Sequence, residues 1–451
     1  MAEENRMGTM PVQKLIIVTS VPLIISLLVN NLYNLVDSIF VAHVSEDALT
    51  GLSLASPLQA IMIAMGSGLA VGLNAAISKA LGEKDQKAVR NTASAAMLMA
   101  VGAYLLIVIA GLMIIEPYFN WQAGGNPVIA AHGKAYTRIC MMFSLGQMIQ
   151  WVFDRFLIAT GRSSLFLVTL STASVVNLIL DPILIFGYLG IPAMGTTGAA
   201  IATVIGQFAG GIMGIVINIR KNKEIPIRFT FRISGRCVAD ILKVGIPTAV
   251  LTGITSVVGV FINTVLYGFS STAVAVYGIC LRIQNIAQIV VHGINNALIP
   301  IIAYNYGAVK DKRIRETIRC AFIIAGVTMA VVLITMELIP DKILLLFDAS
   351  ENMMDIGIPA VRLIALSYFA GAFNIVFAAV YQGFGNGKLS MYLVFARQVV
   401  FLVPLMLLTA YMGRINLVWL TFAAAEAIAI PVGFLLLKKL RTSTLNRVEN
   451  V

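Results

Sequence analysis

The recurrence of long apolar stretches is the feature that most restricts how this chain can fold. Stretches of about 20 or more residues return along the whole sequence, matching the roughly 17–25 residues that a helix needs to cross a bilayer. No segment shows the strict alternation of apolar and polar residues typical of strands. The composition agrees, because 59% of the 451 residues are hydrophobic and 12% are charged, against roughly 25% charged in soluble domains. We therefore predict an all-α integral membrane protein.

The positions of these stretches predict about twelve membrane-spanning helices. The chain begins with acidic residues and has no separate apolar core there, so we expect the first span itself to direct insertion, without a cleaved signal peptide. The predicted spans are 15–42, 51–80, 91–115, 136–160, 165–190, 196–219, 241–268, 277–306, 316–339, 356–384, 389–412 and 415–437.

Basic residues gather in alternate loops between the predicted spans. The net charge of +11 therefore reports membrane topology, and we expect no nucleic acid partner. By the positive-inside rule the basic loops and both termini face the cytoplasm, which predicts a multi-pass protein of the inner (plasma) membrane. The basic residues of these loops are Lys84, Lys87, Arg90, Arg220, Lys221, Lys223, Arg228, Arg232, Arg236, Lys310, Lys312, Arg313 and Arg315.

The second half of the sequence repeats the first at an offset of 225 positions. Each half holds six predicted spans, so the halves are expected to be parallel six-helix bundles related by a pseudo-two-fold axis along the membrane normal. We predict a first bundle over 1–219, a cytoplasmic loop over 220–243 and a second bundle over 244–451. Further along, Gly161 and Gly387 correspond at an offset of 226. The matched pairs at 225 are Pro22 with Pro247, Ser45 with Ser270, Ala48 with Ala273, Gln59 with Gln284, Gly68 with Gly293, Gly82 with Gly307, Lys87 with Lys312 and Arg90 with Arg315.

Acidic and amide side chains interrupt the apolar pattern of the first and fifth spans. Asn30, Asn34 and Asp37 share one face of a helix at i, i+4 and i+7. Asn177 and Asp181 are four residues apart, a spacing that stacks both side chains on one helix face. An ionisable residue at membrane depth is a hypothesis for a functional site, because lipid tolerates it poorly. The asparagines also have a structural explanation as hydrogen-bonding contacts between helices.

Two prolines lie within these polar spans. Pro182 follows Asp181 and lacks an N–H, which frees the carbonyl of Leu178 and predicts a kink. Pro22 lies near the other end of the first span from Asp37 and is a candidate hinge. Its structural alternative is a static bend.

Two buried acids with neighbouring amide and hydroxyl oxygens can hold either a proton or a hard cation such as Na⁺. In the sixth span, Thr203 offers such a hydroxyl within a run of small residues that allows close helix packing. In the second half, Ile262 occupies the position that corresponds to Asp37. No acid there matches Asp37 or Asp181, so we place the ion site in the N-terminal bundle.

Charged residues also interrupt the spans of the second half. Arg282 and Arg397 have two explanations. They pair with Glu426 across the bundle, or they lie near helix ends and extend their charged groups to the interface. Both explanations stay open at this point.

The histidines and cysteines lack the spacing of metal ligands or of a redox pair. No HExxH, GxSxG or paired-His motif occurs either. We therefore expect no enzyme, no cofactor and no metal site beyond a Na⁺ site at the acids of the N-terminal bundle. The residues concerned are His43, His132, His292, Cys140, Cys237, Cys280 and Cys320.

These features together resemble the multidrug and toxic compound extrusion (MATE) family, specifically its DinF-like branch. The resemblance rests on the two parallel lobes, on Asp37 after Pro22, on Asn177-x-x-x-Asp181-Pro182 and on Gly198-Ala199-Ala200-x-Ala202-Thr203. It implies that Pro22 is a hinge and that the substrate cavity includes Asn30, Tyr33, Asn34, Gln59 and Gln284. It also implies a cation or proton site made by Asp37, Asn177, Asp181, Thr203 and the backbone carbonyl of Ala199. Acids that another branch carries in its seventh and tenth helices are not matched here, since the seventh span has none and Asp355 lies at the very start of the tenth.

The expected function is that of a secondary-active antiporter. It would export amphipathic, cationic organic compounds in exchange for H⁺ or Na⁺, as a monomer whose partners are small substrates and membrane lipids. A flippase for lipid-linked saccharides, which shares the two-lobe plan, is the alternative. Arg282 and Arg397 favour the flippase, whereas the acidic and amide residues of the N-terminal bundle argue against an anionic substrate. A channel is disfavoured, because repeats with prolines and acids within the spans are typical of alternating access.

Overall fold

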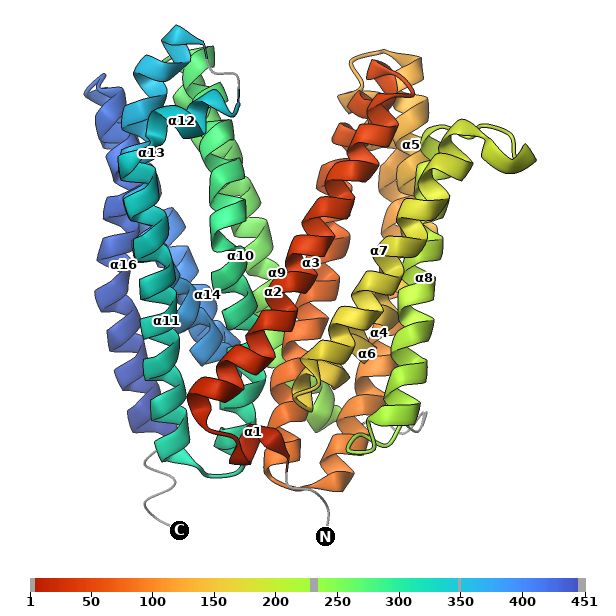
Figure 1. The fold of residues 1–451 in the computed structure, drawn as a ribbon, viewed down its shortest axis with the longest axis vertical. Coiled ribbons are helices and arrows are strands. Elements are labelled where there is room, and N and C mark those ends of the chain that lie inside the picture. The colour runs from red at the N-terminus through yellow and green to blue at the C-terminus, as the bar shows by residue number, and fades with distance from the viewer. Residues whose placement is uncertain (1–4, 228–233, 348–349, 445–451) are drawn as a thin grey trace. The chain divides into compact units, whose positions relative to one another are not determined.

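A computed structural model describes residues 5–227, 234–347 and 350–444, and the regular structure of these residues is helical (Figure 1). Two basic residues predicted to mark a cytoplasmic loop, Arg228 and Arg232, lie outside the described residues. The helices up to residue 221 are α1 Arg6–Thr9, α2 Val12–Ala42, α3 Glu46–Gly82, α4 Gln86–Gln122, α5 Pro127–Met142, α6 Leu145–Ala159, α7 Ser163–Phe186, the short 3₁₀ helix η1 Tyr188–Gly190 and α8 Thr196–Lys221. The helices after it are α9 Gly235–Tyr267, α10 Ser271–Gly307, α11 Asp311–Leu338, α12 Pro340–Leu345, α13 Glu351–Gly383, α14 Gly387–Phe395, the π-helix η2 Ala396–Leu402, α15 Val403–Tyr411 and α16 Ile415–Thr444.

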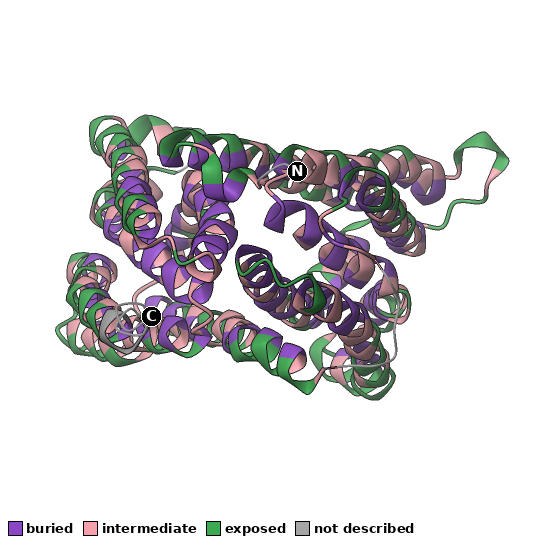
Figure 2. Cartoon of the chain, turned by 90° about the horizontal axis from the view of Figure 1, so that it is seen from below, coloured by how far each residue is buried: buried purple, intermediate pink, exposed green. Residues whose placement is uncertain are grey.

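The described chain divides into two compact units. The first unit comprises residues 1–10 and 17–249, and the second comprises residues 11–16 and 250–451, apart from the residues that are not described. Within each unit, buried residues lie on helix faces turned toward neighbouring helices and exposed residues lie on outward faces (Figure 2). Many outward residues are large and apolar, as lipid contact requires.

Eleven helical stretches of the described chain are long and apolar enough to cross a membrane. They coincide with all but the fourth of the predicted spans, and the all-α membrane fold is confirmed. The fourth span, predicted as one helix over 136–160, is instead α5 and α6, separated at Phe143 and Ser144. The hydroxyl of Ser144 donates to the carbonyl of Met141 at 3.0 Å. The backbone leaves the helical conformation at Phe143, where φ is −112° and ψ is 20°.

The eleventh span is a single stretch with an irregular centre. Between α14 and α15 the backbone follows the π-helix η2. Segments of this type are rare, add a residue to one turn and occur often at functional sites. Nothing in the sequence pattern predicted this segment.

The internal repeat is visible in backbone details of α3 and α10. Ser45 caps α3 by accepting from the N–H of Ala48 at 3.0 Å, and Ser270 caps α10 by accepting from Ala273 at 3.0 Å. After these helices, Lys84 and Val309 both adopt the left-handed conformation with φ of 56°. Each pair is 225 residues apart, because 270 − 45 = 225 and 309 − 84 = 225. The two helices therefore correspond residue by residue.

The glycine turn before the fifth span matches a different glycine of the second half from the one predicted. Gly161 has φ of 73° and precedes α7, while Gly385 has φ of 72° and precedes α14. The structural offset is thus 385 − 161 = 224, and the match of Gly161 with Gly387 is wrong. Gly387 is the first residue of α14, and a chance resemblance of the flanking basic residues produced the predicted offset.

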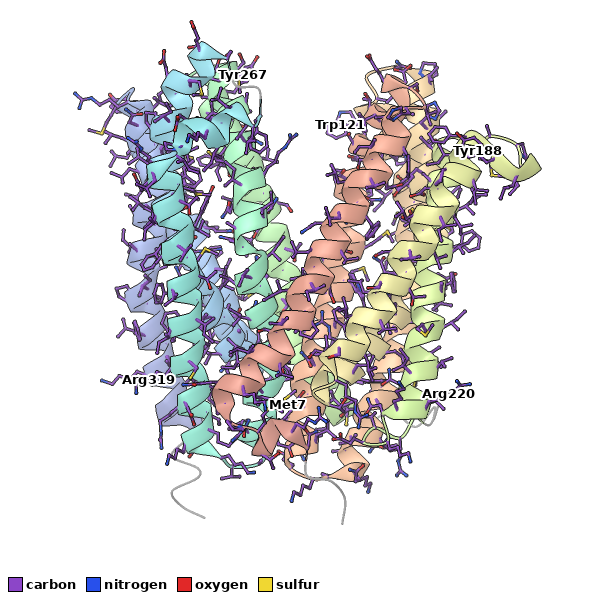
Figure 3. The ribbon with its side chains drawn as sticks, in the orientation of Figure 1. Met7, Trp121, Tyr188, Arg220, Tyr267 and Arg319 are labelled. Atoms are coloured by element: carbon purple, nitrogen blue, oxygen red, sulfur yellow. The ribbon has the colours of Figure 1, made fainter. Side chains whose placement is uncertain are left out.

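The residues labelled in Figure 3 lie at the two ends of each unit. In the first unit, Trp121 and Tyr188 lie at one end, and Met7 and Arg220 lie at the other. In the second unit, Tyr267 and Arg319 lie at opposite ends. The places of Trp121, Tyr188 and Tyr267 fit the preference of Trp and Tyr for the membrane interface. The orientation of the termini stays a prediction.

Candidate functional site

The predicted ion site gathers side chains from α2, α7 and α8 of the first unit. Asp37 lies on α2, Asn177 and Asp181 lie on α7, and Ala199 and Thr203 lie on α8. Asp181 is fully buried and Asp37 is 8% exposed. The structure thus brings together residues that are up to 166 positions apart in the chain, since 203 − 37 = 166.

Asn177 connects the carboxylate of α7 to the hydroxyl of α8. Its Nδ2 donates to Oδ1 of Asp181 at 3.3 Å and to the hydroxyl of Thr203 at 3.4 Å. The hydroxyl of Thr203 donates in turn to the carbonyl of Ala199 at 2.9 Å. With the amide turned by 180°, Asn177 would donate to Oδ2 of Asp181 at 3.2 Å and accept from the backbone N–H of Thr203 at 3.1 Å. Either orientation ties Asp181 to α8.

The two carboxylates of the site lie within hydrogen-bonding reach of one another. No described residue donates to Oδ1 of Asp37, although this oxygen is buried. Two bare carboxylates in contact repel, so the pair is stable when it shares a proton or has a cation beside it. Asp37 and Asp181 therefore form a site that can take up positive charge.

Glycines on α8 allow its backbone to approach α7, and the two helices run side by side (Figure 1). A Cβ atom on Gly206 would lie 2.7 Å from the carbonyl oxygen of Ala173 and 3.0 Å from Cβ of Asn177. A Cβ atom on Gly198 would lie 2.5 Å from the carbonyl oxygen of Leu184. Only residues without a side chain fit at such distances. The small-residue run of the sixth span has the packing role that the sequence predicted.

The two prolines lie within continuous helices. α2 extends from Val12 to Ala42 through Pro22, and α7 extends to Phe186 past Pro182. The hydroxyl of Ser26 donates to the carbonyl of Pro22 at 2.7 Å. The hinge at Pro22 stays a prediction.

A cavity of about 560 Å³ lies within the first unit. Asn30, Tyr33, Asn34 and Gln59 line it, as expected of the substrate cavity, and so does Asp37. Asp37 thus belongs to the carboxylate pair and to the cavity wall at once. Gln284 lies on α10 of the second unit, so its place in a substrate cavity stays a prediction.

A smaller space of about 60 Å³ reaches from this cavity toward the ion site. Asn30, Tyr33 and Thr203 line both spaces, and Asn177 lines the smaller one. The smaller space therefore places Asn177 of the predicted ion site beside two residues of the cavity wall, Asn30 and Tyr33.

The residues of α6 that line this region were not among the predicted site residues. Gln147, Trp151 and Asp154 face the cavity at i, i+4 and i+7, the same spacing that identified the polar face of the first span. Asp154 is 2% exposed and accepts from the hydroxyl of Thr169 at 2.5 Å. The other polar residues of these walls are Ser38, Ser53, Ser56, Ser67, Tyr136, Gln150, Arg155, Ser174 and Gln207.

The cysteines and histidines do not assemble into a metal site. Within the described ranges, no group of three or more His, Cys, Asp or Glu side chains could hold a metal ion. His132 contacts the hydroxyl of Thr196 at 3.0 Å, and Cys140 lines the cavity as a free thiol.

Long apolar helices, duplicated along the chain and enclosing a cavity with buried acids, are the features of a multi-pass membrane transporter. The MatE family model matches residues 22–183 and again residues 247–408. The chain belongs to the MatE family, and the MATE resemblance is confirmed, while its DinF-like branch stays a prediction. The two matched segments begin 247 − 22 = 225 residues apart, the offset of the repeat.

Curated relatives and solved structures agree with this family. The chain is 22% identical to the multidrug export protein MepA of Staphylococcus aureus over 450 residues, which cover 97% of each chain. It is 23% identical to MepA of Staphylococcus haemolyticus over 418 residues, or 92% of this chain and 91% of that one. An outward-facing multidrug resistance MATE transporter of the MOP superfamily superposes with a TM-score of 0.90 at 24% identity, over 99% of both chains.

Proposed function

We propose that this protein is a secondary-active antiporter of the inner membrane that exports amphipathic, cationic organic compounds in exchange for H⁺ or Na⁺. The observation that carries the proposal is the double position of Asp37. Its carboxylate contacts Asp181 and also lines the large cavity. Whatever neutralises the carboxylate pair therefore also changes the charge of the cavity wall.

This shared carboxylate gives a direct physical basis for exchange. When the pair is empty, its negative charge attracts a cationic substrate into the cavity. When a proton or Na⁺ binds at Asp37 and Asp181, that attraction is lost and the substrate is released. By linkage the substrate lowers the affinity for the ion by the same factor. Each conversion between the inward-facing and outward-facing states would then carry either the substrate or the ion, but not both.

The charges of the cavity favour a cation over an anionic saccharide lipid. The charged side chains along its wall are Asp37, Asp154 and Arg155, with a formal sum of −1 − 1 + 1 = −1. A flippase for anionic lipid-linked substrates would instead require a basic wall. The relatives named multidrug export proteins support export of drug-like compounds as the role of this fold.

The test is transport of a lipophilic cationic dye into everted vesicles or proteoliposomes. Dye uptake is measured with an imposed pH gradient, acidic inside, and separately with an imposed Na⁺ gradient, high inside. We expect one of the two gradients to drive uptake, and Asp37→Asn and Asp181→Asn to abolish the response. Gradient-driven uptake by both variants at the rate of the unmodified protein would contradict the proposal.

The matched control is Glu46→Gln. It removes one negative charge from the same unit, but Glu46 is exposed in the first turn of α3 and does not line the cavity. We expect this variant to respond to the gradient as the unmodified protein does. A comparable loss in Glu46→Gln would show that general surface charge, and not the site, determines uptake.

A further inference from the structure

A groove of the second unit lies between α11 and α16, at the end of the unit where Arg319 is found (Figure 3). α13 packs against both of these helices, and Phe384, which follows the last residue of α13, also lines the groove. The volume of the groove is about 220 Å³, whereas one water molecule needs only about 10–15 Å³ of such space. The groove therefore has room for a segment of a larger molecule.

The walls of the groove are mainly apolar and aromatic. Phe322 of α11 and Phe434 of α16 both line it, and their ring centroids lie 6.3 Å apart. Leu437 lies one turn after Phe434 on the same wall. Because Phe434 is 54% exposed, the groove is open on the surface of the unit. A hydrocarbon chain that enters it would bury apolar surface on both walls.

Two arginines of α11 also line this groove. Arg315 and Arg319 are exposed, and no described residue forms an ion pair with either of them. Asp311, in the first turn of α11, lines the groove as well. Two arginines and one aspartate give the lining a formal charge of +1. A guanidinium binds phosphate through paired N–H···O bonds, so the charged part of the groove suits an anionic phosphate group.

The charged and apolar residues follow one another along α11 in the order of the parts of a phospholipid. Arg315, Arg319 and Phe322 occupy positions i, i+4 and i+7 and share one face of the helix. At 1.5 Å per residue, Phe322 lies about 10 Å farther into the span than Arg315. Lipid headgroups lie at the membrane surface and their chains in the hydrocarbon core. The arginines are therefore at the level of a headgroup and the aromatic rings at the level of a chain.

Membrane topology alone does not explain this arrangement. At the repeat offset of 225, the residues of the first unit that correspond to Arg315, Arg319 and Phe322 are Arg90, Ser94 and Met97. The basic residue that reports topology is kept, but the second arginine and the ring are not. Ser94 and Met97 are also buried. The pair of arginines beside an aromatic groove is thus a feature of the second unit, and the orientation rule does not require it.

We propose that this groove binds one anionic phospholipid from the membrane leaflet at the basic end of the protein. Arg315 and Arg319 hold the phosphate of the headgroup, and one acyl chain lies against Phe322, Phe434 and Leu437. Basic pockets between membrane-spanning helices are suited to anionic headgroups. Phosphatidylcholine carries the same phosphate, but its choline cation cancels the charge, so it should bind more weakly. The site lies within the second unit and does not depend on the antiport proposal.

The experiment places a fluorescent reporter in the groove. Phe434→Trp replaces one exposed ring by another, and bromine atoms on an acyl chain quench a tryptophan only at short range. The full chain is reconstituted in phosphatidylcholine vesicles with rising fractions of brominated phosphatidylglycerol or brominated phosphatidylcholine. The signal of the three native tryptophans is subtracted with the unmodified protein. We expect half-maximal quenching by phosphatidylglycerol at a mole fraction at least about fivefold lower than by phosphatidylcholine.

Three pairs of substitutions, each added to Phe434→Trp, make the result specific. Arg315→Gln with Arg319→Gln should make the two lipids quench at equal mole fractions. Arg315→Lys with Arg319→Lys keeps the charge but loses the paired hydrogen bonds, so a smaller preference for phosphatidylglycerol should remain. The matched control is Lys87→Gln with Lys223→Gln, which removes two exposed positive charges from the first unit. The control should keep the whole preference.

Each other outcome contradicts the proposal in a recognisable way. Equal quenching by the two lipids with Phe434→Trp alone would mean ordinary lipid contact, and a preference that survives the double glutamine change would mean that the arginines do not hold the headgroup. An equal loss in the control would assign the preference to general charge. Displacement of brominated phosphatidylglycerol by millimolar inorganic phosphate would show a site for a free anion.

Two features of the design keep the test decisive. Circular dichroism checks that each variant is folded, and the double lysine variant tests the site even where the double glutamine variant does not fold. No transport is measured, so a negative result here leaves the antiport proposal unaffected, and a failure of dye uptake leaves this inference unaffected.

Discussion

The first unit places Asp37 against Asp181 with an amide and a hydroxyl around them, whereas the second unit places Glu426 against Arg397 and Asn374. The carboxylates of the first unit are buried and that of Glu426 is partly buried, and both arrangements use the helices that correspond to the fifth and sixth spans of a repeat. The difference lies in what neutralises the charge. The second unit supplies an arginine beside its carboxylate, and no described residue donates to Oδ1 of Asp37 in the first. Under the proposed function, the first site would take its positive charge from solution and the second would not need to.

The largest effect should follow from breaking the ion pair of the second unit. Glu426→Gln would leave Arg397 charged and without its partner, and breaking a buried pair in this way costs about 3–5 kcal/mol. We expect a value near the lower limit, because the two side chains are 18% and 17% exposed. The measurement is the unfolding free energy in detergent. Adding Arg397→Gln to Glu426→Gln should restore most of the lost unfolding free energy. A double variant as unstable as Glu426→Gln alone would contradict the comparison.

The opposite result is expected in the first unit. Asp37→Asn removes one of two neighbouring negative charges, so stability should be retained or raised while ion-coupled transport is lost. A coupling free energy of about 1–3 kcal/mol corresponds to a change of roughly 5- to 150-fold. Both unfolding and gradient-driven dye uptake are measured on the same preparation. An Asp37→Asn variant that unfolds more easily but still takes up dye in response to the gradient would contradict the comparison.

Two glycines allow the packing beside each site to be compared. Gly206→Ala would place a Cβ atom 2.7 Å from the carbonyl oxygen of Ala173, and such overpacking costs about 1–3 kcal/mol. It should also separate Thr203 from Asn177 and weaken ion coupling. Gly371→Ala would place its Cβ atom 3.4 Å from the carboxylate of Glu426, an ordinary contact. Because alanine favours helix by up to about 1 kcal/mol over glycine, we expect Gly371→Ala to be neutral or slightly stabilising in thermal unfolding.

Much of the first site could be predicted from the sequence, because each of its helices carries the signal locally. Polar residues at helical spacing in an apolar stretch identify a face that must be buried in protein. Asp37, Asn177 and Asp181 all satisfy that rule, and α2 and α7 bring them together as expected. The repeat, read from capping serines and turn positions, was equally accessible, since Ser45 and Ser270 cap equivalent helices.

The sequence did not determine features that depend on contacts between distant helices. Arg282 and Arg397 had the same two explanations in the sequence, pairing with Glu426 or a position near a helix end. The structure places Arg397, and not Arg282, in an ion pair with Glu426. The break at Phe143 and Ser144 is a local departure of the backbone from helical angles, which hydrophobicity does not report. The π-helix of the eleventh span is likewise a local change in hydrogen bonding, with no compositional signal.

The smallest effect should come from the exposed ion pair of the second unit, which isolates burial as the variable. Arg362 and Glu337 lie 3.7 Å apart and are largely solvated, so their coupling in a double-mutant cycle should be about 0–1 kcal/mol. The Arg397–Glu426 pair has the same chemistry at 2.7 Å in a desolvated setting, and its coupling should be several times larger. Both cycles use unfolding free energies at low and high salt. Salt should weaken the exposed coupling much more than the buried one, and equal screening of the two would mean that water reaches Glu426 freely.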